Sequence, residues 1–444
     1  MVDETSKPRS RIYILEPVVK KLPEVAVPKR HISFKEKFLW TGLALLLFFI
    51  MSQIPLYGIP RGTNVGELLG QLKYVFASQT GTLMELGIGP IVTAGIILQL
   101  LVGSKIIGLN LSDPDDRAVF TGAQKLLAIV MGIFEGSMLV LAGRYGVFLD
   151  TGPGLFILFQ LALGSIIVIY LDEIVSKYGF GSGVSLFIAG GVAMTVIWQA
   201  LNPAFGVVPT FARDVMAGES FLDAFFAPRA ANMMGLVATF LVFLIVVWAE
   251  SVSIEIPLAY GKFGGVRGKY PIKFMYTSNI PVILAMTVFA NLRIISAVTG
   301  TGWLVHYTTP PNGLADFAAD PFRAGIYTMV LLGLAVGFAY LWVHMTGMGP
   351  RDVAKQLEDS GMFIPGHRRD PRVMEQTLGR YIMPAAVAGG AFVALLSAGA
   401  DILGALGSGT GILLTVGIVH GLYEQMAREQ VAEMFPAVRR IMGE

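Results

Sequence analysis

The sequence of 444 residues contains no cysteine, and Asp, Glu, Lys and Arg together make up only 14% of it. Without cysteine the chain can form neither a disulfide bond nor a thiolate metal site, and it has no thiol nucleophile. Soluble domains carry about 25% charged residues. The shortage of charge, together with 54% hydrophobic residues, excludes an ordinary soluble domain and indicates a membrane protein.

Ten apolar stretches occupy most of the chain, and most of them contain 19 or more residues without Asp, Glu, Lys or Arg. A helix needs about 20 apolar residues to cross the roughly 30 Å core of a bilayer. Because lipid offers exposed backbone no hydrogen-bond partner, such stretches must be helical. The sequence predicts an all-α membrane protein whose ten transmembrane helices cover 37–58, 86–104, 120–143, 153–171, 182–203, 231–249, 275–295, 324–346, 380–400 and 407–423.

Lys and Arg are distributed unevenly between alternate polar segments. The N-terminal segment, the C-terminal tail and every second loop hold 26 of the 33, and the intervening loops hold 7. Basic residues concentrate on the cytoplasmic side, so both termini are expected in the cytoplasm. Residues 1–37 hold nine Lys and Arg and are not followed by a small-residue cleavage pattern, so they do not resemble a removable signal peptide.

One stretch between the first two spans fits neither a span nor a loop. Apolar residues at positions 65, 68, 69, 72 and 76 recur at three- and four-residue spacing, as on one face of a helix. At about 1.5 Å per residue this helix is too short to cross the bilayer. Two interpretations stay open: a helix on the external membrane surface, or a re-entrant segment that stops a pore.

Short motifs recur at corresponding places in the two sets of five spans. A Gly-Ser-Gly motif at 181–183 precedes the fifth span and another at 407–409 precedes the tenth, while Pro90 and Pro281 lie in register in the second and seventh. Because five is odd, the second set is inserted upside down, and inverted repeats usually place the working site near the midplane. The register puts four branched aliphatic residues at equivalent positions, as a central ring would require: Val92, Ile188, Ile283 and Leu414.

Other classes of function lack their characteristic residues. The glycine-rich stretch 407–411 runs into a span and lacks the strand–turn–helix context of a dinucleotide-binding fold. Asp172 and Asp401 resemble an aspartyl protease pair, but they end spans on opposite sides of the membrane and should not meet. Glu135 is the one carboxylate clearly in the middle of a span, whereas ion coupling normally requires several buried ionisable groups. We therefore expect no enzyme activity, metal or cofactor.

Longer motifs follow one another in a distinctive order: PEV at 23–25, GIGPIVTAG at 87–95, YLDEIVSKY at 170–178, KYPIK at 269–273, SNIPVIL at 278–284 and GALGSGTG at 404–411. Through these motifs the chain, from about residue 12 to its end, resembles the SecY-type protein-conducting channel, the SecY and Sec61-alpha family, and its archaeal branch most of all. The resemblance implies a passive channel that passes unfolded polypeptide across the membrane or releases transmembrane segments sideways into lipid.

The resemblance also implies a seal. The family's plug corresponds to the amphipathic stretch at about 64–78, which favours the stopper interpretation. A narrow aliphatic ring offers water no hydrogen bonds, so it can dewet and block ions when empty. Val184 is smaller than the isoleucine often found at its position in the ring. The implied pore ring consists of Ile88, Val92, Val184, Ile188, Ile283 and Leu414, four of which the internal repeat also selects.

Two further sets of residues are implied. The polar cluster of the family's lateral gate, between spans 2–3 and 7–8, corresponds to Thr93, Glu135 and Asn291, with Glu135 in place of the glutamine common in eukaryotic members. The 6–7 and 8–9 loops resemble the ribosome-docking surface, although Gly264 stands where eukaryotic members carry an arginine. The basic residues that would contact ribosomal phosphate are Lys262, Arg267, Lys269, Arg368 and Arg369.

The implied partners are SecE-type and beta-type small single-span subunits in a heterotrimer, the ribosome, signal sequences, nascent polypeptides and the lipid of the plasma membrane. A secondary transporter with inverted repeats is the alternative, but it would need a polar midplane pocket and coupling charges. We divide the chain into a cytoplasmic N-terminal segment (1–36), a first five-helix half (37–203), a connection (204–274), a second half (231–423) with a cytoplasmic loop at 351–380, and a cytoplasmic tail (424–444).

Overall fold

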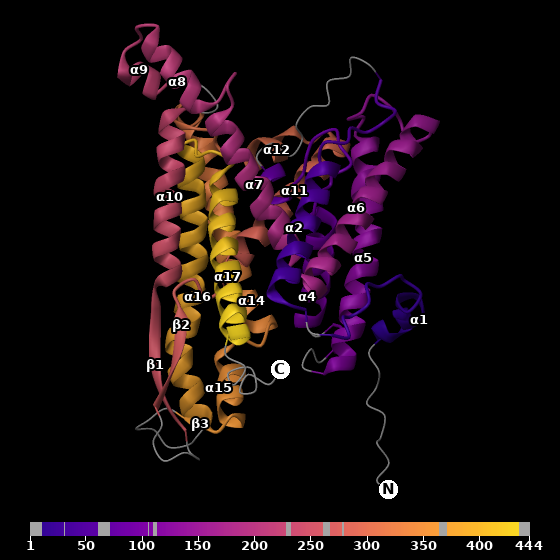
Figure 1. The fold of residues 1–444 in the computed structure, drawn as a ribbon, viewed down its shortest axis with the longest axis vertical. Helices are drawn as coiled ribbons and strands as arrows, with labels where there is room; N and C mark the ends of the chain where they lie inside the picture. Colours follow the sequence, from indigo (N-terminus) through magenta and orange to yellow (C-terminus); the bar gives the residue numbers. More distant parts are fainter. Residues whose placement is uncertain are drawn as a thin grey trace. The chain divides into compact units, whose positions relative to one another are not determined.

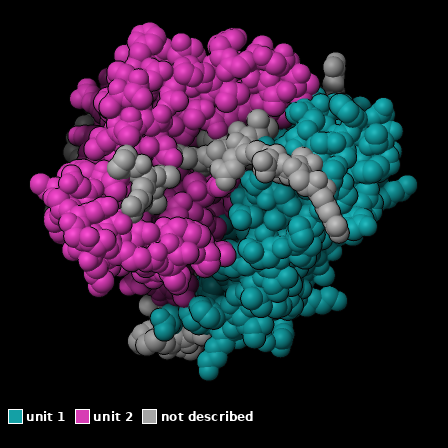
Figure 2. Space-filling model, turned by 90° about the horizontal axis from the view of Figure 1, so that it is seen from above, with its two compact units in different colours: residues 1–67, 78–187, 429–444 teal, residues 68–77, 188–428 magenta. Residues whose placement is uncertain are grey.

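The computed structural model describes residues 11–30, 32–60, 72–104, 106–109, 113–227, 232–260, 267–277, 279–363 and 371–434. The chain forms two compact units, coloured separately in Figure 2. Unit 1 comprises 1–67, 78–187 and 429–444, and unit 2 comprises 68–77 and 188–428. The short segment 68–77, which includes part of the predicted plug, therefore belongs to the second unit although its neighbours in sequence belong to the first.

Four long helices build unit 1. α5 packs against both α4 and α6, and α2 packs against α6. Proline stands in the first turn of α4, α5 and α6, where its missing N–H costs no hydrogen bond. The bounds, labelled in Figure 1, are η1 Arg11–Leu15, α1 Glu16–Val19, α2 Phe34–Met51, α4 Gly89–Gly103, α5 Pro114–Leu141, α6 Gly152–Tyr178 and the beginning of α7 Gly183–Leu201.

Small residues bring α5 and α6 close together. A Cβ built on Gly132 would lie 2.9 Å from the Cβ of Ser165, and one built on Gly136 would lie 3.2 Å from a methyl group of Leu158. Helices within a membrane associate through close packing because lipid and side chains are equally apolar. These glycines therefore fix the line along which α5 and α6 meet.

Unit 2 contains the remaining helices. α14 packs against α11 and α16, which are its principal neighbours. The elements are α3 Leu72–Val75, the rest of α7 from residue 188, α8 Val207–Met216, α9 Phe221–Phe225, α10 Met233–Ser251, α11 Ile280–Thr299, α12 Gly302–Thr308, α13 Leu314–Ala319, α14 Pro321–Met345, α15 Pro350–Asp359, α16 Pro371–Ile402 and α17 Gly409–Met434, whose last six residues belong to unit 1.

A small antiparallel sheet, which the sequence analysis did not predict, follows α10. Strands β1 (Ser253–Tyr260), β2 (Arg267–Lys273) and β3 (Met362–Phe363) pair in the order β2-β1-β3, with Ile256 opposite Tyr270 and Tyr260 opposite Met362. In Figure 1 the two long strands run beside one end of α16. The chain is therefore helical in its spans, with β1 and β2 between α10 and α11 and β3 between α15 and α16.

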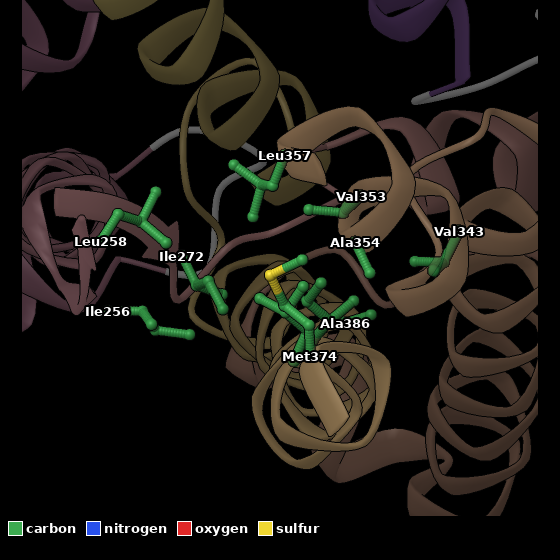
Figure 3. Close-up of a cluster of buried hydrophobic side chains, with 11 residues drawn as sticks. Ile256, Leu258, Ile272, Val343, Val353, Ala354, Leu357, Met374 and Ala386 are labelled. Atoms are coloured by element: carbon green, nitrogen blue, oxygen red, sulfur yellow. The ribbon is translucent and has the colours of Figure 1, made fainter. Parts of the chain in front are cut away.

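The sheet and the nearby helices share one hydrophobic core, shown in Figure 3. Ile256, Leu258 and Ile272 of the sheet pack with Val353 and Leu357 of α15 and with side chains of α14 and α16. α16 has 32 residues, so at about 1.5 Å per residue it exceeds a bilayer core of roughly 30 Å. We call this part of unit 2, namely β1, β2, β3, α15 and the beginning of α16, the platform.

Each of the ten predicted spans falls on a described helix. Seven described helices are long and apolar enough to cross a membrane, and α4 is a shorter apolar helix. The segment before α4 is not helical, and its backbone bonds elsewhere: the Leu83 amide donates to Ile54 O (3.0 Å) and the Leu56 amide to Gly81 O (2.9 Å). Irregular backbone at membrane depth is tolerated where protein satisfies it, which explains how a span can contain a short helix.

Candidate functional site

The six residues of the predicted pore ring all lie at the N-terminal ends of helices. Ile88 caps α4, and each of the other five lies within the first six residues of α4, α7, α11 or α17. Ile88, Ile188 and Leu414 are buried, and Val92, Val184 and Ile283 are partly exposed. Ile88, Val92 and Val184 belong to unit 1, and Ile188, Ile283 and Leu414 belong to unit 2.

Within unit 2 the helix segments that carry the three aliphatic residues adjoin one another. Asn279, which caps α11, donates a hydrogen bond from Nδ2 to the backbone oxygen of Leu413 in α17 (3.3 Å). A Cβ on Gly411 of α17 would lie 3.1 Å from a methyl group of Val192 in α7. Ile188, Ile283 and Leu414 each lie within about one helical turn of these contacts.

A partly buried carboxylate fixes the beginning of α7. Asp172, near the end of α6, accepts hydrogen bonds at Oδ1 from the Val184 amide (2.9 Å) and from the Ser182 hydroxyl (3.2 Å). A Cβ on Gly183 would lie 2.5 Å from the Cα of Asp172. Only glycine permits this approach, so the Gly-Ser-Gly motif is explained by how closely α7 begins against α6.

The second Gly-Ser-Gly motif is held in a related way in unit 2. Asp401, near the end of α16, accepts a hydrogen bond at Oδ1 from the Gly409 amide (2.6 Å), the first residue of α17. A Cβ on Gly409 would lie 2.2 Å from the backbone oxygen of Ser397. The sequence predicted only that the two aspartates do not form a catalytic pair, and this capping role was missed. An aspartate before Gly-Ser-Gly in both halves was the available signal.

The predicted polar cluster is joined in part. The hydroxyl of Thr93 in α4 donates a hydrogen bond to Glu135 Oε1 in α5 (3.0 Å), and both side chains are buried. Asn291 lies on α11 in unit 2 and is partly buried. In the structure Thr93 and Glu135 therefore meet, and their hydrogen bond connects α4 to α5.

The part of the predicted plug that the structure describes is seated in unit 2. Val75 and Phe76 are buried. The Tyr74 hydroxyl accepts a hydrogen bond from Gln199 Nε2 in α7 (3.3 Å), and Gln199 Oε1 accepts one from the Gly407 amide (3.1 Å). Residues 64–71 of the predicted plug helix lie outside the described residues, and α3 covers 72–75.

A buried ion pair fixes the segment that follows the plug. Arg144 donates hydrogen bonds from Nη2 (2.7 Å) and Nε (3.0 Å) to Glu85 Oε1, and the Gly81 amide donates to Glu85 Oε2. Both charged side chains are less than 10% exposed. At residue 77 the backbone takes φ +48°, a left-handed conformation unusual for alanine. The chain thus turns sharply where it leaves the plug and is then anchored in unit 1.

Of the predicted ribosome-docking residues, the structure describes Arg267 and Lys269, both on strand β2 of the platform. Lys269 is exposed on β2 and forms an ion pair with Glu255 across the strand pair. Arg267 begins β2, and its side chain is not among those described. Lys262, Arg368 and Arg369 lie outside the described residues.

Helical spans, aliphatic residues at the beginnings of four helices, and a seated plug segment define a helical membrane channel with a stopper. Comparison with known families agrees. The SecY family pattern matches residues 82–423, and the pattern of the plug domain of Sec61p matches residues 46–81. The protein belongs to the SecY family.

Individual relatives are similar over almost the whole chain. The protein translocase subunit SecY of Pyrococcus furiosus is 42% identical, over 98% of this chain and 99% of its own. A solved structure of a protein-conducting channel is 43% identical with a TM-score of 0.83, covering 96% of this chain and 99% of that one. Sec61 in the canine ribosome–channel complex from the endoplasmic reticulum is 42% identical with a TM-score of 0.80 and the same coverage.

Proposed function

We propose that this chain is the central subunit of a protein-translocation channel. It passes unfolded secretory polypeptides across the membrane and releases transmembrane segments sideways into lipid, without catalysing a reaction. The observation that carries the proposal is the placing of six aliphatic residues at the beginnings of four helices, in a chain that matches the SecY family over 82–423. A solute transporter would instead need polar, ionisable groups at these positions.

The six aliphatic residues form the seal of the resting channel. Branched apolar side chains offer water no hydrogen bonds, so a narrow ring of them dewets and stops ions. Because such side chains have no directional bonds, they close around any translocating sequence without selecting it. The plug adds a second barrier, and Tyr74 and Gln199 hold it in place while no substrate is present.

Thr93, Glu135 and Asn291 form the polar seam of the lateral gate. Hydrogen bonds between spans are worth about 0.6–2 kcal/mol each, which is small enough for an entering signal sequence to compete with them. The bond between Thr93 and Glu135 supports the first part of this seam, because it joins α4 to α5 inside the membrane.

The platform is the docking surface for the ribosome, with Lys262, Arg267, Lys269, Arg368 and Arg369 as its phosphate contacts. Its core of sheet and helix side chains supports this role, because a packed core gives the connecting loops a rigid base. Lys and Arg bind phosphate without reading base sequence, which suits a channel that accepts every translating ribosome. The similarity to Sec61 in a ribosome–channel complex agrees with this proposal.

The complex also contains SecE-type and beta-type small single-span subunits and lies in the plasma membrane, with both termini in the cytoplasm. The orientation is supported by the bias of Lys and Arg toward the N-terminal segment, the C-terminal tail and every second loop. The domain division at 37–203 and 231–423 follows from the internal repeat.

The experiment is reconstitution of the purified complex into planar bilayers and vesicles. Ile188→Gly with Leu414→Gly should raise the resting ion conductance several-fold, while unfolded polypeptide still crosses. Ile197→Gly with Val419→Gly is the matched control, because these residues lie on the same two helices and are exposed. Unchanged conductance of the folded ring variant would exclude the seal, and failure of the unaltered complex to pass polypeptide would exclude the channel.

A further inference from the structure

Two of the sequence motifs that the channel function leaves unexplained bind each other. The motif at 23–25 and the motif at 170–178 are almost 150 residues apart in sequence. In the structure the N-terminal residues 12–26, which we call the strap, run over one end of α4, α5 and α6, all within unit 1.

The first part of the strap packs on α4 and α5. Ile12 is buried in a cluster with Leu98 of α4 and with Val119 and Phe120 of α5. The Tyr13 hydroxyl donates a hydrogen bond to Asp116 Oδ1 (2.5 Å), and this carboxylate raises the pKa of Tyr13 to about 12. The hydroxyl therefore keeps its proton, and the bond persists, at any physiological pH.

A glycine allows the strap to lie directly on α5. A Cβ built on Gly122 would lie only 2.1 Å from a methyl group of Val19. Since that distance is far below any van der Waals contact, a side chain at this position would lift the strap from the helix.

The second part of the strap is held through its backbone by one face of α6. Pro23 O accepts a hydrogen bond from Tyr170 (3.0 Å), the Val25 amide donates to Glu173 Oε1 (3.1 Å), and Ala26 O accepts one from Tyr178 (2.8 Å). Tyr170, Glu173 and Lys177 are three and four residues apart, so they share a face of the helix. Lys177 adds a bond to Val25 O and an ion pair with Glu24 (3.1 Å).

Lys125 connects this arrangement to α5. Its Nζ donates to Pro23 O (2.7 Å), pairs with Glu173 Oε2 of α6 (2.7 Å) and lies 4.4 Å from the centre of the Tyr170 ring. Lys125 and Glu173 are both less than 16% exposed, so solvent screens the pair weakly. The chain joins α5 to α6 at the opposite ends of the two helices, through residues 142–151. At the other end, where α5 begins and α6 ends, the strap is therefore the continuous chain segment that contacts both helices.

We propose that the strap restrains the gate helices: by holding α4 and α5 against α6, it limits how far they move when a transmembrane segment leaves sideways. This rests on the proposed function, because Thr93 and Glu135 of the gate lie on α4 and α5. The strap is a positioning element. Its main chain is held by the side chains of Lys125 in α5 and of Tyr170, Glu173 and Lys177 in α6, so the restraint depends on these four residues. Loosening it lets less hydrophobic segments leave into lipid.

The test measures the ratio of lateral release to full translocation for test segments of graded hydrophobicity, in the reconstituted complex. The reference is the test segment for which the unaltered chain gives equal release and translocation. For this segment Lys177→Met should raise the ratio about threefold to tenfold, as expected for losing one or two charge-assisted hydrogen bonds. Gly122→Val, tested separately, should raise it by a similar factor because it lifts the strap from α5. Lys35→Met is the matched control, because Lys35 is an exposed basic residue of the same cytoplasmic region.

The absence of cysteine allows the opposite change. Glu24→Cys with Lys177→Cys, joined by a short bismaleimide, should lower the ratio, and the unjoined double variant should raise it. Equal ratios in the joined and unjoined forms, or an equal rise in Lys35→Met, would overturn the strap proposal. Failure of the unaltered complex to release any segment would instead overturn the proposed channel function, so the two failures are distinguishable.

Discussion

The carboxylate of Asp172 lies 2.9 Å from the backbone nitrogen of Val184, so a residue in the last two turns of α6 fixes a proposed ring residue at the beginning of α7. In unit 2, Asp401 lies 2.6 Å from the Gly409 nitrogen. Each half of the internal repeat therefore contains a carboxylate, partly buried at Asp172 and buried at Asp401, that holds the N-terminal end of a ring-bearing helix, where the helix dipole favours a negative charge.

Replacing Asp172 should loosen the N-terminal end of α7 without changing any side chain of the proposed ring. Loss of an N-terminal capping side chain costs about 0.5–2 kcal/mol, so Asp172→Ala should raise the resting ion conductance of the reconstituted channel severalfold. Asp401→Ala should act in the same direction through α17. Single-channel recordings measure the effect.

The conservative variant separates capping from general damage. Asp172→Asn keeps an oxygen that can accept the Val184 amide, so its conductance should stay close to that of the unaltered chain. If Asp172→Asn leaks as much as Asp172→Ala while both remain folded, the capping bond does not control the seal.

The plug should be released more often when Tyr74 loses its hydroxyl. Tyr74→Phe removes the acceptor for Gln199, and a neutral hydrogen bond is worth about 0.5–1.5 kcal/mol. We expect brief openings of the resting channel to become about two to ten times more frequent. Tyr57→Phe, at an exposed tyrosine, is the control. Identical opening frequencies in the two variants would show that the plug does not depend on this bond.

Glu135→Leu should make lateral release more demanding. Among the described residues, Thr93 is the side-chain hydrogen-bond partner of the buried Glu135 carboxylate. Leucine loses this bond, which alone would ease opening, but an opening seam hydrates a carboxylate and does not hydrate leucine, and we expect the hydration term to be the larger of the two. The closed seam is therefore favoured, and test segments should need greater hydrophobicity to enter lipid, by about 1 kcal/mol of transfer free energy. Glu135→Gln keeps the hydrogen bond and should shift the threshold less. A threshold that is the same in all three forms would remove Glu135 from the gate.

The spans were predictable because the free-energy cost of burying charge in lipid excludes Lys, Arg, Asp and Glu from long stretches of sequence. Such uncharged stretches can be read directly from the sequence without knowing the fold. The meeting of Thr93 and Glu135 also followed from motif resemblance. The sheet was missed because the loop between the sixth and seventh spans was considered only for its charge, although Ile256 and Leu258 alternate with polar or exposed residues. The strap could not be predicted, since most of its bonds to α6 and to Lys125 use its own backbone atoms and leave no pattern in its sequence.

The platform should bind ribosomes through its basic loops. Arg368→Glu with Arg369→Glu should weaken cosedimentation with ribosomes at least tenfold at low salt, because reversing charges opposes phosphate and loses the counterion-release term. Arg213→Glu with Arg229→Glu makes the same charge change in a loop expected on the opposite side of the membrane. Undiminished cosedimentation of the first variant, or equal loss in the second, would contradict docking at this surface.

The ion pair between Glu85 and Arg144 predicts a stability change with a definite pH dependence. Burial raises the pKa of Glu85, although Arg144 and the Gly81 amide oppose the rise. Removing one partner of a buried pair costs about 3–5 kcal/mol, so Arg144→Met should lower the thermal unfolding temperature markedly. Without Arg144 the pKa of Glu85 rises further. A carboxyl whose pKa is raised by folding favours the folded state below its unfolded pKa, and this contribution is lost as the pH rises through the folded pKa.

Arg144→Met should therefore lose more stability at the higher of two pH values, about 8, than at the lower, about 5, relative to the unaltered chain, because a raised pKa disfavours the charged carboxyl in the folded state and the charged form gains as the pH rises. Adding Glu85→Gln removes the titrating group, so the double variant should be more stable than Arg144→Met alone at the higher pH and should show little pH dependence of its own. Thermal unfolding of the purified complex in detergent at both pH values measures this. A double variant less stable than Arg144→Met at both pH values would mean that Glu85 acts through its bond to the Gly81 amide, rather than as the counter-charge of Arg144.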